Sequence, residues 1–467
     1  MNTSDRQDIA YDQVADVVII GGGVAGLSAA LTAAELGRSV VVLEKQPQPG
    51  GSSAMSGGFF AFCETDEQRA HGVSDSRELF LTDLREVGGH RNDEALLAAY
   101  LDRQEELYRW LKRLGVTFPA LELSSGQSVP RSHHTPPRPL LALLTERLLA
   151  TGHARILTEH RAVELERADG RVHGVLVESP AGPRRFGARG GVIVTSGGFS
   201  RSSELLGIFA PAQTAALPYG GAGNTGDGLR MAWKLGAGFR DMGWISATYG
   251  SHPETGVERH ELLCAYYLGA IIVNTNGRRF VDESHSYKLL GDTCLRQPEG
   301  LGFQIFDSQV RERSEPGVPL SDIDFLEDKG RLFKGDTLAE LAAEAGLDPA
   351  VLTATVEHYN AAVRGEVADE FGRDGLCNHT GRRGELTKGP FYAYPAKALM
   401  TSTYCGLTIT ANAEVTDVRG AVIEGLYAAG EVTGGFHGVA YMTGTSLGKG
   451  ALFGRTAGRE AAGRVPA

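Results

Sequence analysis

Two short apolar runs flank an alanine-rich segment near the beginning of the chain. The runs cover residues 16–20 and 39–43, and residues 27–36 lie between them. Glycines follow the first run, as they do where a buried strand turns tightly into a helix. The pattern predicts a strand, a helix and a second strand within about thirty residues, which is the size of one βαβ unit.

Helical and strand-like patterns alternate along the rest of the chain. Residues 76–114 carry apolar positions at helical spacing with a break at Gly88 and Gly89, which predicts a pair of helices. Residues 171–195 predict strands that lead into a second glycine turn. Residues 425–430 predict a strand followed by a glycine loop and a helix.

Two further helices are predicted over residues 337–364. The first is expected to begin at Asp336 and end near Gly346. The second has Pro349 in its first turn, where proline is tolerated. We take both helices as part of an inserted domain.

Length and composition narrow the class of protein. A chain of 467 residues usually forms two or three domains. Its 62 glycines follow no Gly-X-Y period and cluster beside apolar strands, as in nucleotide-binding α/β enzymes. The net charge of -11 argues against nucleic acid or an anionic membrane surface as the main partner.

The cysteines and the N-terminal sequence indicate in which cellular compartment we expect the protein. The five cysteines form no C-x-x-C pair and no zinc spacing, so we expect a reducing compartment, no structural disulfide and no metal site. The N-terminus lacks the basic-then-apolar pattern of a signal peptide, and no apolar run is long enough to span a bilayer. We therefore expect a cytoplasmic enzyme without a membrane span.

Residues 21–26 have the spacing G-x-G-x-x-G between the first predicted strand and helix. Gly21 permits the tight turn, Gly23 lets backbone N–H groups approach a pyrophosphate, and Gly26 lets helix and strand pack closely. Glu44 ends the second strand, where its carboxylate accepts a hydrogen bond from a ribose hydroxyl. The pattern predicts an FAD or NAD site, and the alternative is a turn whose glycines serve packing alone.

Two later segments favour FAD. Residues 50–58 form a small-residue loop that is short enough to lie against a flat ring system. Glu431 follows a predicted buried strand, where its carboxylate could hold a ribityl hydroxyl.

Several segments, taken in order along the chain, resemble the flavoprotein subunit family of fumarate reductase and succinate dehydrogenase, which includes the soluble fumarate reductases and the 3-ketosteroid dehydrogenases. They are residues 21–44, 50–58, 72–76, 195–199, 224–232, 269–274, 277–283 and 425–435. The resemblance implies an α/β fold with a Rossmann-like FAD-binding domain over residues 1–245 and 402–467. It also implies an inserted α+β capping domain over residues 246–401, with the flavin at the interface.

The cofactor is expected to be non-covalent FAD, because Ser53 and Ala54 stand where covalently flavinylated members carry a histidine. The haem motifs of some members are missing, so we expect an external electron acceptor or donor. The residues expected at the cofactor are Gly21, Gly23, Gly26, Glu44, Lys45, Gly51, Ser52, Ser56, Gly57, Gly58, Val163, Thr195, Gly197, Asp227, Glu431, Ser446 and Leu447.

Several substrate-binding cations of the fumarate reductases are replaced in this chain. Those enzymes hold two carboxylates with Arg and His side chains, and each charged hydrogen bond contributes roughly 1.5–3 kcal/mol. Tyr266, Tyr287 and Tyr441 stand at positions resembling family arginines, and residues 401–406 replace a His-His-Thr-x-Gly-Gly segment. We therefore do not expect a dicarboxylate substrate.

Tyrosine hydroxyls suit a ketone, and the 3-ketosteroid dehydrogenases carry a tyrosine at the position resembling Tyr287. A phenol O–H donates to a carbonyl oxygen as it gains enolate charge, and a second tyrosine with a lowered pKa removes the α proton. The β hydride then passes to flavin N5, which gives an α,β-unsaturated ketone. The expected catalytic residues are Tyr287, Tyr441, Tyr404, Ser402 and Tyr266, with Ser402 and Tyr404 competing for one role.

Three functions stay open at this point. The first is an FAD-dependent dehydrogenase that desaturates a cyclic or steroid-like ketone. The second is a reductase of an enone or an unsaturated monocarboxylate, and the third is a flavin-binding protein without turnover. A structural alternative for the tyrosines is that they fill space left by longer side chains, with their hydroxyls bonded to the backbone.

Overall fold

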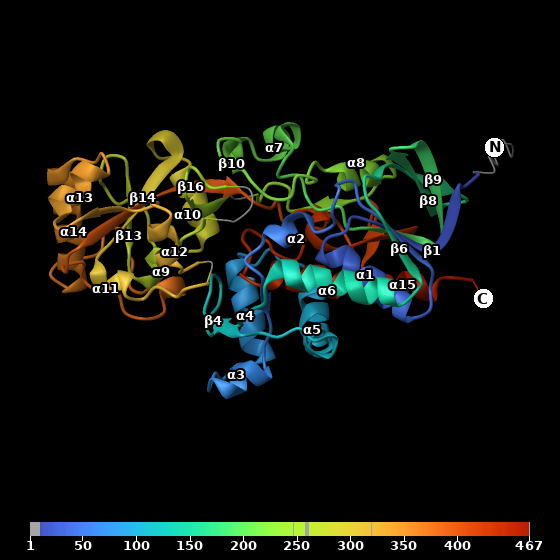
Figure 1. Ribbon diagram of the computed structural model, residues 1–467, viewed down its shortest axis with the longest axis horizontal. Coiled ribbons are helices and arrows are strands. Elements are labelled where there is room, and N and C mark those ends of the chain that lie inside the picture. The colour runs from blue at the N-terminus through green and yellow to red at the C-terminus, as the bar shows by residue number, and fades with distance from the viewer. Residues whose placement is uncertain (1–9, 246, 257–260, 319, 467) are drawn as a thin grey trace.

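The computed structural model describes residues 10–245, 247–256, 261–318 and 320–466 (Figure 1). Their buried apolar side chains form two cores. One draws on residues 15–247 and 398–462, and the other on residues 249–396. On this basis we propose to keep the predicted division at residues 245 and 402, and we call the two parts the nucleotide domain and the cap.

The nucleotide domain is built on an eight-stranded sheet with the main order β18-β19-β9-β1-β2-β6. Neighbours from β19 to β6 along this order run parallel, which explains why β1 and β2 are continuous apolar runs buried on both faces. The strands are β1 (Gln13–Ile20), β2 (Val40–Leu43), β6 (Ala154–Leu157), β7 (Arg161–Ala168), β8 (Arg171–Ser179), β9 (Gly182–Val194), β18 (Glu414–Thr416) and β19 (Val422–Ala428). The predicted α/β class is confirmed.

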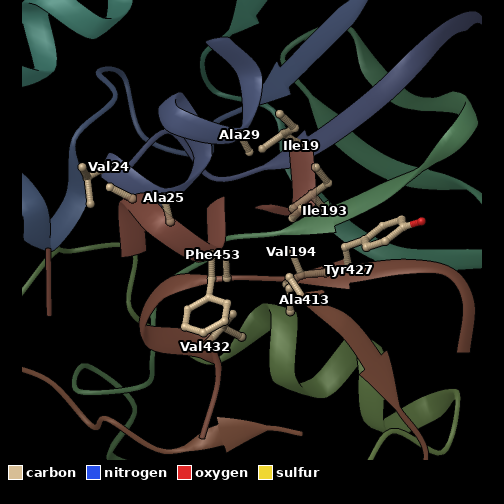
Figure 2. Packing of buried hydrophobic residues seen from close by; sticks show 14 of the residues in the cluster. Ile19, Val24, Ala25, Ala29, Ile193, Val194, Ala413, Tyr427, Val432 and Phe453 are labelled. Atoms are coloured by element: carbon tan, nitrogen blue, oxygen red, sulfur yellow. The ribbon is translucent and has the colours of Figure 1, made fainter. Parts of the chain in front are cut away.

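Helices α1 (Val24–Glu35) and α15 (Thr445–Gly463) pack closely against each other. A Cβ on Gly454 would lie 2.3 Å from the backbone oxygen of Ala25, so the two helix backbones touch where glycine occurs. Figure 2 shows part of this cluster, with Ile19 of β1, Ala25 and Ala29 of α1, Ile193 of β9 and Phe453 of α15.

Smaller elements complete the nucleotide domain. The predicted helical pair is confirmed as α4 (Arg77–Val87) and α5 (Glu94–Leu114), separated at Gly88 and Gly89. The others are α2 (Gly51–Met55), β3 (Phe59–Ala61), α3 (Asp66–Ala70), β4 (Ala120–Glu122), β5 (Ser132–His134), α6 (Pro137–Ala150), α7 (Ser203–Phe209), η1 (Pro211–Gln213), α8 (Asp227–Lys234), β11 (Phe239–Arg240), β17 (Gly406–Leu407) and η4 (Gly430–Val432). None of the helices in the described ranges has the length and apolar character needed to cross a membrane.

The cap lies at the opposite end of the molecule from the termini (Figure 1). Its sheet has the order β10-β16-β14-β13, with β12 and β15 also paired to β16. Strand β10 (Leu217–Pro218) belongs to the nucleotide domain and joins the two parts. The cap elements are β12 (Thr248–Ser251), α9 (Ala265–Leu268), β13 (Ile271–Asn274), α10 (Tyr287–Cys294), η2 (Pro298–Gly300), β14 (Leu301–Phe306), α11 (Ser308–Arg311), α12 (Ile323–Asp328), β15 (Phe333–Gly335), α13 (Leu338–Glu344), α14 (Pro349–Val363), η3 (Cys377–His379) and β16 (Phe391–Met400).

The first of the two predicted cap helices begins one residue later than expected. Thr337, not Asp336, is the N-cap of α13, and its hydroxyl accepts from the backbone N–H of Glu340. The Glu340 carboxylate in turn accepts from the backbone N–H of Thr337, which forms a capping box. The pair of Thr337 and Glu340 therefore sets this helix start.

Candidate active site

A cleft of about 550 Å³ lies at the carboxyl ends of β1 and β2 and extends to the cap. Ile20 and Leu43, the last residues of these strands, line it together with the glycine turn. Parallel sheets bind nucleotides at this edge, because the strand ends and the following turns leave a crevice there.

The three motif glycines occupy different surroundings. Gly21 has a φ of +105°, and a Cβ there would lie 2.4 Å from the backbone oxygen of Thr195. A Cβ on Gly26 would lie 1.9 Å from the backbone oxygen of Gly21, so this position tolerates no side chain. Gly23 lines the cleft, and a Cβ there would make only ordinary contacts, with the Ser53 hydroxyl at 3.4 Å and the backbone oxygen of Gly50 at 3.8 Å. Its surroundings leave room for a ligand to approach the backbone.

Helix α1 presents its N-terminus to the cleft without a competing acid. Its N-cap is Gly23, which offers no side-chain cap, and its first turn contains no acidic residue. The backbone N–H of Val24 donates to the Ser53 hydroxyl at 3.1 Å. A helix N-terminus of this kind suits a pyrophosphate, since its N–H groups and its dipole both favour an anion.

Glu44 is held in place by two backbone donors. Its Oε2 accepts from the N–H of Gly22 at 2.9 Å, and its Oε1 accepts from the N–H of Gln46 at 2.8 Å. Each oxygen keeps a further lone pair. The fixed carboxylate on the cleft wall fits the ribose diol of a dinucleotide.

Lys45 and Asp227, both expected at the cofactor, are paired with each other at the cleft edge. Lys45 Nζ lies 2.9 Å from Asp227 Oδ2, and Arg161 also donates to this carboxylate. Burial alone would raise the pKa of Asp227, but the hydrogen bonds from Arg161 and Lys45 outweigh it and lower the value to about 2. This pair links the end of β2 to the start of α8.

A second polar network lies farther along the cleft. Asn224 Nδ2 donates to the Ser52 hydroxyl at 2.9 Å and to Glu431 Oε2 at 3.0 Å. Glu431 Oε1 accepts from the backbone N–H of Thr403 at 2.9 Å, and burial raises the pKa of this carboxyl. Asn224 lay within a segment that marked the resemblance, yet the sequence prediction did not include it among the site residues.

Most of the predicted cofactor residues line this one cleft. They are Gly21, Gly23, Glu44, Lys45, Gly51, Ser52, Ser56, Gly57, Gly58, Thr195, Gly197, Asp227, Glu431, Ser446 and Leu447. Gly26 does not line it and serves the close packing described above. Val163 does not line it either, because neighbouring residues of a strand face opposite ways and Ala162 of β7 takes the place on the cleft wall.

Tyr287, Tyr441 and Thr443 form a cluster of hydroxyls where the cap meets the nucleotide domain. Tyr287 donates to the Tyr441 hydroxyl at 2.5 Å, and its oxygen lies 2.9 Å from Thr443 Oγ1. All three residues line the cleft. Thr443 was not predicted from the sequence, where nothing distinguishes it from a buried threonine.

Tyr404 stacks on Tyr441, with 4.5 Å between ring centroids and 18° between planes. Its φ of +50° is uncommon for a residue with a side chain, and such strain persists only where surrounding contacts hold it. Ser402 also lines the cleft, so the structure brings four of the five predicted catalytic residues together.

Tyr266 is the exception among the predicted catalytic residues. It is fully buried in the cap core, its ring lies 4.6 Å from that of Tyr267, and its hydroxyl donates to Cys264 Sγ at 3.1 Å. It does not line the cleft. The short helix α9 turns this side chain into the cap, so the expectation that it faces the substrate is corrected.

Burial raises the pKa values of Tyr287, Tyr404 and Tyr441 well above the usual value of 10.0. The expected lowering of one tyrosine pKa is therefore not present in this structure. The three phenols are neutral at physiological pH, and a neutral phenol is a hydrogen-bond donor. Proton uptake at neutral pH needs another group or a change on substrate binding.

Lys288 is a buried cation beside the tyrosines that the sequence prediction missed. Its Nζ lies 5.1 Å from the ring centroid of Tyr404 and 5.9 Å from that of Tyr441, and it donates to Thr401 Oγ1 at 3.4 Å. Burial lowers the pKa of Lys288 to about 7, against the opposing effects of Asp292 and Glu431. Lys288 therefore exchanges a proton in the physiological range.

Replacing Lys288 by Met should raise the free energy of unfolding near pH 7 by about 2–4 kcal/mol. The unfolded chain binds a proton on this lysine up to about pH 10.5, whereas the native state releases it near pH 7. The native protein should therefore gain stability as pH rises from 7 to about 10, and the Met variant should lack this gain. Urea unfolding at several pH values measures the difference.

Lys334→Met is the matched control, because Lys334 also lies over a ring, that of Tyr392, but is 54% exposed. Its effect on the free energy of unfolding should be small and nearly independent of pH. A Lys288→Met variant with the same pH slope as the native protein would contradict the lowered lysine pKa.

The chain is similar to known proteins over most of its length. A family described as an FAD binding domain matches residues 16–447. A probable fumarate reductase of Shewanella frigidimarina is 30% identical over 462 residues, which cover 96% of this chain and 75% of that protein. A 4-oxocyclohexanecarboxylate 2-dehydrogenase of Sinomonas cyclohexanicum is 31% identical over 554 residues, which cover 96% of this chain and 93% of that protein.

A solved structure shares the arrangement of both parts of the chain. It is a 3-ketosteroid Δ4-(5α)-dehydrogenase from Rhodococcus jostii in complex with 4-androstene-3,17-dione. The TM-score is 0.76 at 26% sequence identity, over 98% of this chain and 99% of that one.

Proposed function

This chain belongs to the FAD binding domain family of flavin-dependent oxidoreductases. Within this family, we propose that it is a dehydrogenase that introduces a double bond next to the carbonyl of a cyclic ketone. The observation that carries the proposal is the hydroxyl cluster of Tyr287, Tyr441 and Thr443 on the cleft wall. Its donors are neutral, and they suit an uncharged carbonyl oxygen.

The lining that the cap contributes to the cleft supports a neutral substrate. Among the described cap residues, those on the cleft wall carry no charge, and they are Thr248, Leu262, Tyr287, Leu320 and Thr401. A dicarboxylate would lose its hydration against this lining, and from the cap Lys288 behind Thr401 could balance only one of its two charges, which is unfavourable. A ketone with an apolar ring system meets no such penalty.

The nucleotide side of the cleft fits FAD. The glycine turn and the N-terminus of α1 would hold the pyrophosphate, Glu44 would hold the adenosine ribose, and the Asn224–Glu431 network would hold the ribityl chain. Bound FAD would supply the oxidant, taking up a hydride at its N5 position. We expect the cofactor to be non-covalent, and an external acceptor to remove the electrons.

The hydroxyl groups of this chain would stabilise the substrate's carbonyl oxygen and carry away its α proton. Tyr287 or Tyr441 donates to the carbonyl oxygen and stabilises the negative charge that develops as the α proton leaves. The hydrogen bonds between Tyr287, Tyr441 and Thr443 offer a path along which that proton moves. Thr401 lines the cleft and accepts from Lys288, so it connects the site to a group that titrates near pH 7.

Two of the relatives support dehydrogenation of a ring ketone as the reaction. One is named as a dehydrogenase of 4-oxocyclohexanecarboxylate and another was solved with a 3-ketosteroid bound. Both substrates contain a six-membered ring with a ketone, which is the class we propose here.

Anaerobic mixing of the FAD-loaded enzyme with saturated ring ketones tests the proposal. A panel of cyclohexanone derivatives and 3-ketosteroids should include at least one compound that removes the absorbance of oxidised flavin and yields the enone. Artificial acceptors should then restore the absorbance. If no ketone bleaches the flavin while enones reoxidise the reduced enzyme, the dehydrogenase assignment is wrong.

That second outcome would support the reductase of an enone or an unsaturated monocarboxylate. The similarity to a probable fumarate reductase favours this candidate, since its name describes reduction of a C=C bond. The same neutral donors would stabilise enolate charge in either direction. An external electron donor would then replace the acceptor.

A further inference from the structure

Three potential metal ligands meet on the cap outside the cleft. Asp282 and His285 precede α10, and His379 is the last residue of η3. One ligand atom from each of the three lies within 4.8 Å of the others. The two imidazole rings meet edge to face, with 5.9 Å between centroids. None of the three lines the cleft described above.

The hydrogen bonds of Asp282 leave one of its oxygens facing the histidines. Oδ1 accepts from the N–H of Ser284 at 2.9 Å and from its hydroxyl at 2.7 Å. Oδ2 lies 3.8 Å from Nε2 of His285. Asp282 is therefore oriented by one oxygen and presents the other to the cluster.

His379 is oriented by a carboxylate behind it. Its Nδ1 lies 2.6 Å from Oδ1 of Asp374, and the Ser284 hydroxyl lies 3.3 Å from Nδ1 and 3.4 Å from Nε2. In the tautomer whose Nδ1–H donates to the Asp374 carboxylate, Nε2 keeps its lone pair. Metal-binding histidines commonly donate their second N–H to a carboxylate, which fixes the ring and raises its basicity. This contact is independent of the three-ligand cluster and points to the same use of His379.

The backbone around His379 is strained and anchored. Asn378 and His379 have φ values of +51° and +60°, which side-chain-bearing residues rarely adopt. Asn378 holds this conformation by accepting from the N–H of Gly126 and by donating to the carbonyls of Ser124 and Gln127. His379 is thus fixed where the cap contacts the nucleotide domain.

We propose that Asp282, His285 and His379 bind a divalent transition-metal ion of the Zn²⁺ class, with Asp374 orienting His379. Two imidazoles and a carboxylate suit zinc and its neighbours, whereas Mg²⁺ and Ca²⁺ prefer oxygen ligands alone. The side chains of His285 and His379 are 45% and 47% exposed, which gives an ion access and leaves room for water as the remaining ligand.

An ion bound at this cluster would restrain the chain segment that precedes Tyr287. Residues 282–286 lead directly into Tyr287 at the start of α10. An ion bound here would tie this segment to residues 377–379, which contact the nucleotide domain through Asn378. It would therefore restrain the loop that positions Tyr287 without touching the cleft.

Metal titration of the full-length, FAD-loaded protein tests the site. After dialysis against a chelator, calorimetry with Zn²⁺ should show one saturable ion per chain, and Co²⁺ should give visible d–d absorption. His379→Ala and His285→Ala should each weaken binding at least tenfold, and Asp374→Asn should weaken it by about 10- to 100-fold. His71→Ala, at an exposed histidine outside the cluster, should bind as the native protein does.

The flavin spectrum of each variant checks that it is folded, so binding is compared between intact proteins. Saturable binding that His379→Ala weakens and His71→Ala preserves would establish the site. Absence of saturable binding in the native protein, or equal affinities in all variants, would overturn the proposal. The readout requires no turnover and is independent of the proposed function.

Discussion

Tyr287→Phe should lower kcat for ketone dehydrogenation by about 100- to 1000-fold while leaving FAD content unchanged. The substitution removes the hydroxyl that donates to Tyr441 and contacts Thr443, and it adds no bulk. Loss of one preorganised donor to a developing oxyanion typically has an effect of this size. Steady-state kinetics with the ketone identified by the bleaching experiment, together with the flavin spectrum, measure it.

Tyr266→Phe is the matched control for this prediction. Tyr266 was also expected at the substrate, but its hydroxyl donates to Cys264 Sγ within the cap core. Its loss should change kcat by no more than a few fold. Equal effects of the two substitutions would show that the tyrosines act through cap stability and not through the substrate.

Gly26→Ala should yield protein that lacks FAD and is destabilised by about 3–5 kcal/mol. The added Cβ would lie 1.9 Å from the backbone oxygen of Gly21 and 2.7 Å from Thr195 Oγ1. The backbone oxygen of Gly21 cannot move away by a side-chain rotation, so the glycine turn and the N-terminus of α1 must separate. The ratio of flavin to protein absorbance and the thermal unfolding midpoint measure both effects.

Gly207→Ala in α7 is the control for Gly26→Ala. Apart from its chain neighbours and its own helix backbone, no atom of the described residues lies within 4 Å of a Cβ at Gly207, and its φ is not in the left-handed range. In a helix this change should be neutral or stabilise by up to about 1 kcal/mol. Retention of FAD by Gly26→Ala at the native level would contradict the packing argument.

The glycine turn and Glu44 could be predicted from sequence because their roles are local. A strand, a G-x-G-x-x-G turn and a helix fix the backbone within one βαβ unit, and Glu44 follows at the end of the next strand. The resemblance extended this prediction to the cap. Even so, Val163 was expected at the cofactor, whereas its neighbour Ala162 lines the cleft, since successive side chains of a strand point to opposite faces.

Residues that depend on tertiary packing could not be found in this way. Lys288 follows Tyr287 in the sequence as an ordinary helical lysine, and only the packing of α10 beside residues 401–404 buries it against aromatic rings. The prediction for Tyr266 was wrong because its side chain packs into the cap core instead of facing the cleft. His379 joins Asp282 and His285 only in the folded cap, at no spacing that a metal motif would reveal.

The pairing of β10 with β16 has a mechanical consequence for the active site. Leu217 and Pro218 extend the cap sheet from the nucleotide domain, and the N–H of Tyr219 donates to the carbonyl of Met400 beside them. This pairing ties the cap sheet to the nucleotide domain next to Ser402. Because Tyr287 belongs to the cap and Tyr441 to the nucleotide domain, the hydrogen bond between them depends on the separation that this pairing sets.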